Sequence, residues 1–217
     1  MPQIKWEKWF ADVEPYYRSF PPSHDFSHIQ RVFHSAMRIG AGEGADLYIL
    51  GLAALLHDMG RPKEEESEGE LCHAEVSAAM AKGLLLQKGT PLIAIKRIIH
   101  CIDSHRYRGG KKPLSLEARC LFDADKLDSL GAIGIARSYL WLGEHGGPVY
   151  GDPEMWGKFD PGLKKPEYDS LQREWAIKYR YIKERLFTKT ARDMALGRHA
   201  FMENFLEVLE NEIKSGL

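Results

Sequence analysis

The adjacent pair His57 and Asp58 ends the apolar run LYILGLAALLHDMG. An imidazole and a carboxylate pack poorly in a core, but they are good ligands for a cation, and the C-terminal end of a helix favours positive charge. His28 lies upstream in SHDFSHIQRV, and Asp125 lies downstream in LFDADKLDSLG. Two imidazoles and two carboxylates suit a hard or borderline divalent ion and leave positions for water and phosphate oxygens. A histidine hydrogen-bonded at a helix end is the alternative interpretation of the dipeptide alone.

Three histidines compete for the upstream ligand position: His24, His28 and His34. Helical periodicity does not separate His28 from His34, since both flank the apolar stripe of their expected helix. His28 lies in the first turn, close to a loop, where the wall of a pocket is expected. We therefore predict that His28 is the ligand.

The helix expected to begin at Ser115 brings two carboxylates onto one face, which carries Leu121, Ala124, Asp125 and Asp128. Asp123 points elsewhere. Two carboxylates on an inward face are costly unless a cation or hydrogen bonds satisfy them. An ion pair with an arginine or with Lys126 is the alternative to a metal ion.

Two further histidines lie where apolar helical stripes end, namely His73 and His105. A single histidine in such a place is more often a core residue than a ligand, but several at the ends of different helices favour a shared pocket. Basic side chains close to these motifs could neutralise a phosphate: Arg61, Lys63 and Lys126.

The chain has 217 residues, of which 44% are hydrophobic and 28% charged, a composition typical of a globular protein with one large or two small domains. Its net charge of -1 argues against charge-driven binding to polymeric nucleic acid or anionic membranes. The three cysteines follow no ligand spacing, so a disulfide framework is not expected. With no apolar N-terminal segment, the sequence predicts a protein of the reducing cytosol.

Nearly every periodic segment predicts a helix and no run alternates as a strand, so we expect an all-α fold. The expected helices cover roughly residues 3–18, 46–57, 72–87, 115–129, 130–144, 167–188 and 190–214. Another helix is capped by Ser23 or Asp25 and runs to about residue 40, and Thr90 and Pro91 open a further one. Gly60 is expected to take a left-handed conformation, with Pro62 preventing continuation of the helix. The acidic stretch KEEESEGE is expected to be a solvated loop. The Gly/Pro-rich segment 146–166 predicts a lid or binding loop or, alternatively, an irregular surface arm.

The ordered set H…HD…D resembles the HD-domain metal-dependent phosphohydrolases. The closer resemblance is to a small bacterial and archaeal subgroup of predicted HD hydrolases. It rests on HDFSHIQRV, LAALLHDMGRPK, HAEVSAAMA, SLEARCLFDADKLDSLGAIGIARSY and RHAFMENFLEVLENE, and so covers nearly the whole chain. The resemblance implies one helical HD-type domain over residues 1–217, with a metal-site core at about 20–130 and flanking helices and a long loop at 131–217.

The same resemblance implies that His28, His57, Asp58 and Asp125 hold one divalent ion, which would be Mn, Mg, Co, Ni, Fe or Zn. It implies hydrolysis of phosphate esters or anhydrides, commonly in nucleotides. Some relatives release pyrophosphate from nucleoside triphosphates, and others are 5′-nucleotidases or cyclic-nucleotide phosphodiesterases. Dinuclear branches add histidines between the HD pair and the last aspartate. His73 and His105 could play that part, although this chain lacks an adjacent histidine pair there.

We therefore expect a metal-activated water, oriented by Asp58 or Asp128, to attack a small phosphorylated substrate. His105 would act as general acid or base. The residues expected to bind the substrate are Arg61, Lys63, His73 and Lys126. An idle HD domain that binds a nucleotide as a sensor or scaffold is the alternative of another class, and a structural metal protein is the third. The intact ligand set and its two carboxylates argue against both.

Overall fold

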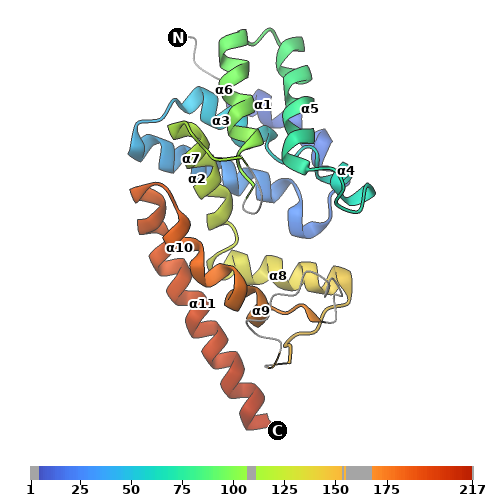
Figure 1. The fold of residues 1–217 in the computed structure, drawn as a ribbon, viewed down its shortest axis with the longest axis vertical. Helices are drawn as coiled ribbons and strands as arrows, with labels where there is room; N and C mark the ends of the chain where they lie inside the picture. The colour runs from blue at the N-terminus through green and yellow to red at the C-terminus, as the bar shows by residue number, and fades with distance from the viewer. Residues whose placement is uncertain (1–4, 107–110, 153, 155–167, 217) are drawn as a thin grey trace. The chain divides into compact units, whose positions relative to one another are not determined.

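The computed structural model describes residues 5–106, 111–152, 154 and 168–216. Every regular element in these ranges is helical (Figure 1), which confirms the predicted all-α class. Within the described ranges, no helix has both the length and the apolar character needed to cross a membrane. The chain divides into two compact units, one formed by Met1–Asp125 with Phe187–Ala191 and the other by Lys126–Leu186 with Arg192–Leu217. The sequence predicted one domain with its core at about 20–130, and the division falls near the end of that core.

Among its described residues, the first unit contains seven helices in whole or in large part, together with the short 3-10 helices η1 (Glu14–Tyr17) and η2 (Pro22–His24). These helices are α1 (Trp6–Val13), α2 (Phe26–Glu43), α3 (Leu47–Leu56), α4 (Arg61–Glu66), α5 (His73–Gln87), α6 (Leu92–Asp103) and α7 (Leu116–Leu127). The expected helix at 3–18 is thus two pieces, because the proline at position 15 lies in the first turn of η1.

The central helix of the first unit is α3, against which α1, α2, α5 and α6 pack. Its N-cap is Asp46, whose side chain accepts hydrogen bonds from the backbone N–H of Tyr48 and Ile49 at 3.1 and 3.3 Å. Residues 49–56 are all buried, as a helix that is apolar on every side requires. Its C-cap is His57, so the structure places the HD pair at the end of this buried helix.

The turn after the HD pair differs from the prediction. Gly60 has φ −91° and ψ −1°, which is not left-handed, and the helix α4 begins immediately after it. A Cβ at Gly60 would lie 2.6 Å from the backbone nitrogen of Ser77 and 2.8 Å from the carbonyl oxygen of His73. The glycine is therefore needed for the close approach of α5. Pro62 lies in the first turn of α4, where a proline is tolerated.

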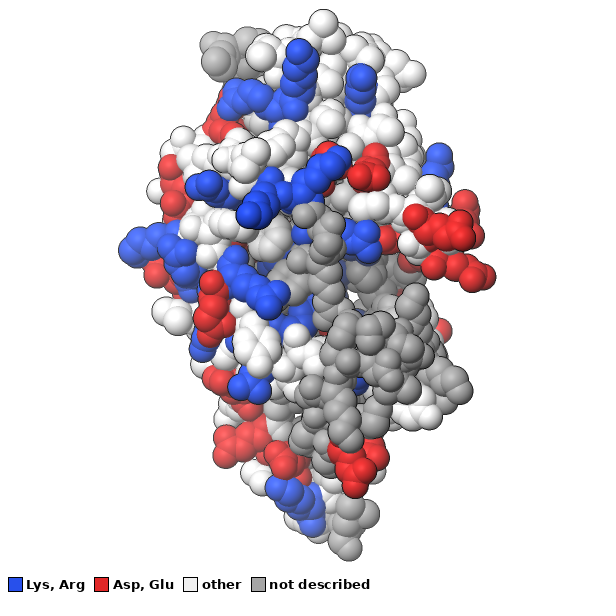
Figure 2. Space-filling view, viewed as in Figure 1, with Lys and Arg blue, Asp and Glu red and all other residues white. Residues whose placement is uncertain are grey.

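The acidic stretch is also only partly a loop, because its first residues lie in α4. Figure 2 shows acidic side chains gathered at this edge of the first unit, where Glu65, Glu66, Glu68 and Glu70 are exposed. Glu64 differs from them, since its side chain is only 19% exposed and faces the protein. The prediction of solvent exposure was therefore correct for Glu65, Glu66, Glu68 and Glu70 and wrong for Glu64, and the prediction of a loop was wrong for residues 63–66.

The start of the last helix, α11 (Lys189–Gly216), is joined to α7 by a buried carboxylate. Asp123 accepts hydrogen bonds from the backbone N–H groups of Phe187 and Thr188, at 2.9 and 2.8 Å, and from the Thr188 hydroxyl at 2.7 Å. As predicted, Asp123 lies on a different face of α7 from Asp125. Its burial is accounted for by these three donors.

The second unit contains α8 (Gly131–His145), α9 (Leu171–Ile177), η5 (Tyr179–Tyr181), α10 (Ile182–Arg185) and most of α11. The predicted helix at 167–188 is broken into three pieces, with non-helical backbone at Lys178 (φ −140°, ψ −62°) and at Leu186 (φ −70°, ψ 139°). No glycine or proline lies in that stretch, so the sequence carries no stop signal there. Most of the predicted 146–166 loop lies outside the described residues.

Candidate metal centre

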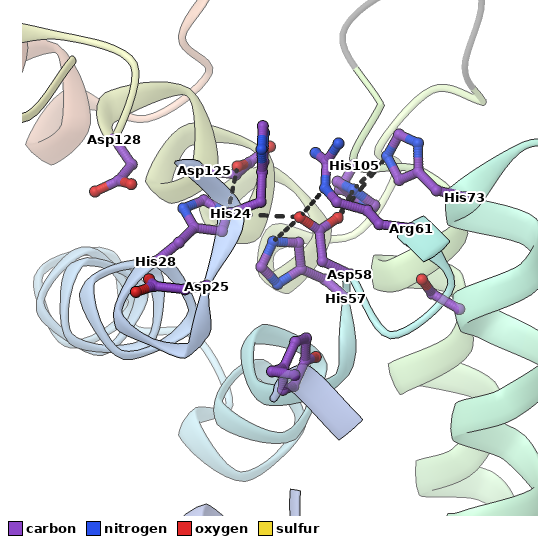
Figure 3. Close-up of polar contacts among 12 residues, drawn as sticks. His24, Asp25, His28, His57, Asp58, Arg61, His73, His105, Asp125 and Asp128 are labelled. Atoms are coloured by element: carbon purple, nitrogen blue, oxygen red, sulfur yellow. Dashed lines mark hydrogen bonds and ion pairs between the residues drawn. The ribbon is translucent and has the colours of Figure 1, made fainter. Parts of the chain in front are cut away.

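The four residues predicted to bind the metal ion come together in the first unit (Figure 3). His28 lies in the first turn of α2, His57 and Asp58 follow α3, and Asp125 lies near the end of α7. The Nε2 atom of His28 is 3.5 Å from Asp58 Oδ2 and 3.6 Å from Asp125 Oδ1. The Nε2 atom of His57 is 3.6 Å from Asp58 Oδ2. All four residues are at most 7% exposed.

Of the three histidines near the start of α2, His28 is the one that meets the HD pair. His34 is exposed and stacks on Phe10, with ring centroids 6.3 Å apart. His24 is half-buried, and its Nδ1 lies 3.1 Å from the hydroxyl of Ser23. The geometry therefore agrees with the choice of His28 made from its position in the first turn.

The ring of His57 is held in the form that a metal ligand requires. Its Nδ1 lies 2.8 Å from the carbonyl oxygen of Ala54 and donates a hydrogen bond to it, which leaves the lone pair on Nε2 facing the site. That Nε2 is buried and has no hydrogen-bond partner among the described residues. Burial, the largest cause, lowers the pKa of His57 to about 4, so the ring is neutral near pH 7.

Asp58 is buried and ionised. Burial opposes its ionisation, but the guanidinium of Arg61 and the nearby His57 outweigh that effect and hold the pKa of Asp58 well below its usual range. Arg61 Nε donates to Asp58 Oδ2 at 2.5 Å. The other oxygen, Oδ1, is buried without a hydrogen-bond partner in the described part of the chain.

A second group of nitrogen atoms surrounds Asp58 Oδ1. His105 Nε2 lies 3.4 Å and His73 Nε2 3.9 Å from this oxygen, and the two Nε2 atoms are 3.3 Å apart. The Nδ1 of His105 donates to the carbonyl oxygen of Ile102 at 2.6 Å. The Nδ1 of His73 lies 2.7 Å from Glu64 Oε2. Burial, foremost, lowers the pKa of His73 to about 4.

These contacts place acceptor atoms opposite one another, which is unfavourable without a positive charge between them. Two triads have ligand-type atoms within 4.8 Å of one another, namely His28, His57 and Asp125, and His57, Asp58 and His105. The imidazole and carboxylate donors suit a divalent transition metal or magnesium. The residues therefore fit the divalent ion that the sequence predicted.

The remaining predicted residues lie in three environments. Arg61 is 22% exposed beside Asp58, and Lys63 is exposed on α4. Lys126 and Asp128 belong to the second unit and are 8% and 3% exposed. Asp128 Oδ2 accepts a hydrogen bond from Arg137 at 3.0 Å within that unit. The catalytic and substrate-binding roles of these residues stay predictions.

Sequence reasoning missed Glu64, which the structure brings to His73. The run of glutamates suggested solvent exposure and hid one member that faces inward. The available signal was Pro62, because a proline in a first turn predicts a helix that would place Glu64 one turn after Arg61 on the same face.

Comparisons with known proteins identify the family of the chain. The model of the HD domain matches residues 25–130, a range that includes all four predicted ligands. The uncharacterized protein YpgQ of Bacillus subtilis (strain 168) is 34% identical over 194 residues, covering 88% of this chain and 84% of that protein. The structure of Bacillus subtilis YpgQ in complex with ADP has a TM-score of 0.72 at 29% identity, covering 94% and 97% of the two chains. A predicted HD superfamily hydrolase from an uncultured Thermotogales bacterium has a TM-score of 0.66 at 29% identity, covering 95% and 91%.

Proposed function

Because this chain belongs to the HD-domain family, whose members include predicted hydrolases, we propose that it is a metal-dependent phosphohydrolase of nucleotides or similar small phosphorylated metabolites. The observation that carries the proposal is a pair of buried acceptors, His57 Nε2 and Asp58 Oδ1, which lie at the centre of the predicted ligand set and have no hydrogen-bond partner among the described residues. A neutral imidazole and an ionised carboxylate in this arrangement are ready to bind a divalent cation.

A nucleotide substrate is supported by the relative YpgQ, which was crystallised in complex with ADP. Release of pyrophosphate from a nucleoside triphosphate is the first candidate reaction. The alternatives are a 5′-nucleotidase and a cyclic-nucleotide phosphodiesterase. All three reactions need a cation that polarises a phosphoryl oxygen and an activated water.

Different side chains would bind the metal ion and the phosphate groups. His28, His57, Asp58 and Asp125 would hold the ion, which when bound supplies Lewis acidity and lowers the pKa of a water. Arg61, whose guanidinium reaches solvent beside Asp58, would neutralise phosphate charge, with Lys63 and Lys126 as further candidates.

Proton transfer is assigned to His105, and the orientation of the water to Asp58 or Asp128. The Nδ1 of His105 is tied to the carbonyl oxygen of Ile102, so Nε2 is the atom that would exchange a proton at the centre. Asp58 contacts both groups of histidines through its two oxygens, which suits the orienting role.

Product identification tests the proposal. The purified protein, loaded with Mn²⁺, should hydrolyse at least one member of a panel of nucleoside mono-, di- and triphosphates and cyclic nucleotides. Pyrophosphate, orthophosphate or free nucleoside among the products would each name a different enzyme. Tight nucleotide binding with no turnover for any metal would instead support the sensor or scaffold alternative and refute the proposal.

A further inference from the structure

The carboxylate of Glu64 in α4 forms a hydrogen bond with a ring nitrogen of His73, the first residue of α5. Glu64 Oε2 lies 2.7 Å from His73 Nδ1, and Glu64 Oε1 lies 3.5 Å from the guanidinium of Arg106. The His73 side chain is 9% exposed and that of Glu64 is 19% exposed, so solvent competes little for this hydrogen bond. An ionised carboxylate can only accept hydrogen bonds, so the hydrogen must be on Nδ1.

In a neutral imidazole, a hydrogen on Nδ1 leaves a lone pair on Nε2. The Nε2 of His73 faces the centre, 3.3 Å from His105 Nε2 and 3.9 Å from Asp58 Oδ1 (Figure 3). Glu64 therefore determines what His73 offers to the site. With Glu64 in place, His73 presents an acceptor, whereas without it the hydrogen is free to move to Nε2 and the ring is free to turn.

The backbone of His73 is fixed as well. The N–H of Gly60 donates to the hydroxyl of Ser77 at 2.8 Å, and the absent Cβ of Gly60 allows the His73 carbonyl to approach. The first turn of α5 is thus attached to the turn that follows the HD pair. The side chain of His73 can still rotate, and its hydrogen bond with Glu64 restrains that rotation.

We propose that Glu64 is a positioning residue for the hydrolytic reaction and that it acts through His73, by holding Nδ1–H and turning Nε2 toward Asp58 and His105. This inference rests on the proposed function. In the described hydrogen bonds and ion pairs, Glu64 contacts His73 and Arg106 but none of the four predicted metal ligands. Its removal should therefore change turnover more than metal content.

The activity test is a double-mutant cycle. Glu64→Ala should lower kcat by about 10–100-fold, the usual effect of removing a partner that orients an active-site histidine, with a smaller change in KM. In the His73→Gln background, Glu64→Ala should have less than about a two-fold further effect, because its target is gone. Losses that multiply in the double variant would overturn the inference.

Two matched variants separate orientation from charge. Glu64→Gln keeps an oxygen that can accept from His73 Nδ1–H, so it should recover most of the activity that Glu64→Ala loses. Glu65→Ala removes an exposed carboxylate from the same helix and should behave as the wild type. Equal losses in Glu64→Gln and Glu64→Ala would contradict a role in positioning the ring.

A second measurement does not depend on activity. In protein loaded with diamagnetic Mg²⁺, the imidazole ¹⁵N shifts of His73, assigned by their absence in His73→Gln, should show a protonated Nδ1 and an unprotonated Nε2. In Glu64→Ala this pattern should move toward the other tautomer. An unchanged pattern would refute the role of Glu64, even if the wild-type protein hydrolysed no nucleotide. If the pattern shifts in Glu64→Ala but the wild-type protein is inactive, the proposed function is refuted, while the role of Glu64 in orienting His73 is retained.

Discussion

Asp58 Oδ1 and His105 Nε2 face each other at 3.4 Å, and both side chains are about 1% exposed. A carboxylate oxygen and a ring nitrogen at this distance can share a proton or a cation. Because Nδ1 of His105 is occupied by the carbonyl oxygen of Ile102, the relationship is fixed from both sides of the ring. What lies between the two atoms decides the role of His105.

The variant His105→Gln separates these roles. If His105 transfers a proton, turnover should fall roughly 10²–10⁴-fold while metal content stays nearly unchanged. If it is a ligand of a second ion, metal content should fall by about half together with turnover. If it is only a core histidine, turnover should hold while the free energy of unfolding falls by about 1–3 kcal/mol. Elemental analysis, kinetics and denaturant unfolding on this variant check the prediction, and the first outcome is the one we expect.

Removal of the HD pair should remove the metal ion. His57→Ala and Asp58→Ala each remove one of the four predicted metal ligands. The bound metal should therefore be lost, while the protein stays folded. A fall in stability of several kcal/mol is also expected, since the remaining polar groups are left buried without their partner. Full metal occupancy in both variants would contradict the site.

The two histidines of α2 should differ sharply. His28 is buried against Asp58 and Asp125, whereas His34 is exposed and stacks on Phe10. His28→Ala should therefore abolish nucleotide hydrolysis, and His34→Ala should leave it within a few-fold of the wild type. Steady-state kinetics at saturating metal are the measurement. Loss of activity in His34→Ala with retention in His28→Ala would mean that the metal is held elsewhere.

The metal-free protein should lose stability as the pH falls. Burial lowers the pKa of His57 from 6.5 to about 4 in the folded state, so the unfolded chain binds the proton more readily between these values. The stabilisation is present above pH 6.5 and is lost as the pH falls toward 4, on the order of 3 kcal/mol for this group. Denaturant unfolding at pH values from about 7.5 down to about 4.5 should show this slope of the free energy of unfolding against pH. It should be smaller in His57→Gln and unchanged in His34→Gln, and equal slopes in all three proteins would refute the assignment.

Two glycines provide a matched test of the turn after the HD pair. Gly60→Ala should lower the free energy of unfolding by about 1–3 kcal/mol and reduce activity, because its Cβ would collide with backbone atoms of Ser77 and His73. A Cβ at Gly83, in the middle of α5, would meet nothing within 4 Å. Gly83→Ala should therefore stabilise the protein by about 0.5–1 kcal/mol. The prediction fails if the two variants unfold alike.

The sequence predicted the parts of the site that depend on strong local signals. An apolar helix beginning at Asp46 placed the HD pair, and a first-turn position distinguished His28 from His34. Pro62 indicated the helix that carries Glu64, but the inward orientation of Glu64 could not be predicted, since charge-rich segments are usually solvated and the orientation depends on α5. The breaks at Lys178 and Leu186 were missed for a similar reason, because tertiary packing rather than a glycine or proline ends those helices.

The carboxylate of Asp123 has a consequence for how much of the chain the metal centre needs. Two positions before the predicted ligand Asp125, it is buried with donors that come from residues 187 and 188, far along the sequence. A fragment that stopped at residue 130, where the HD-domain match ends, would keep all four ligands but strand this charge in the interior. We therefore expect a fragment of residues 1–130 to be less stable than the full chain, because the helix that carries the last predicted ligand needs residues 187 and 188 to satisfy Asp123.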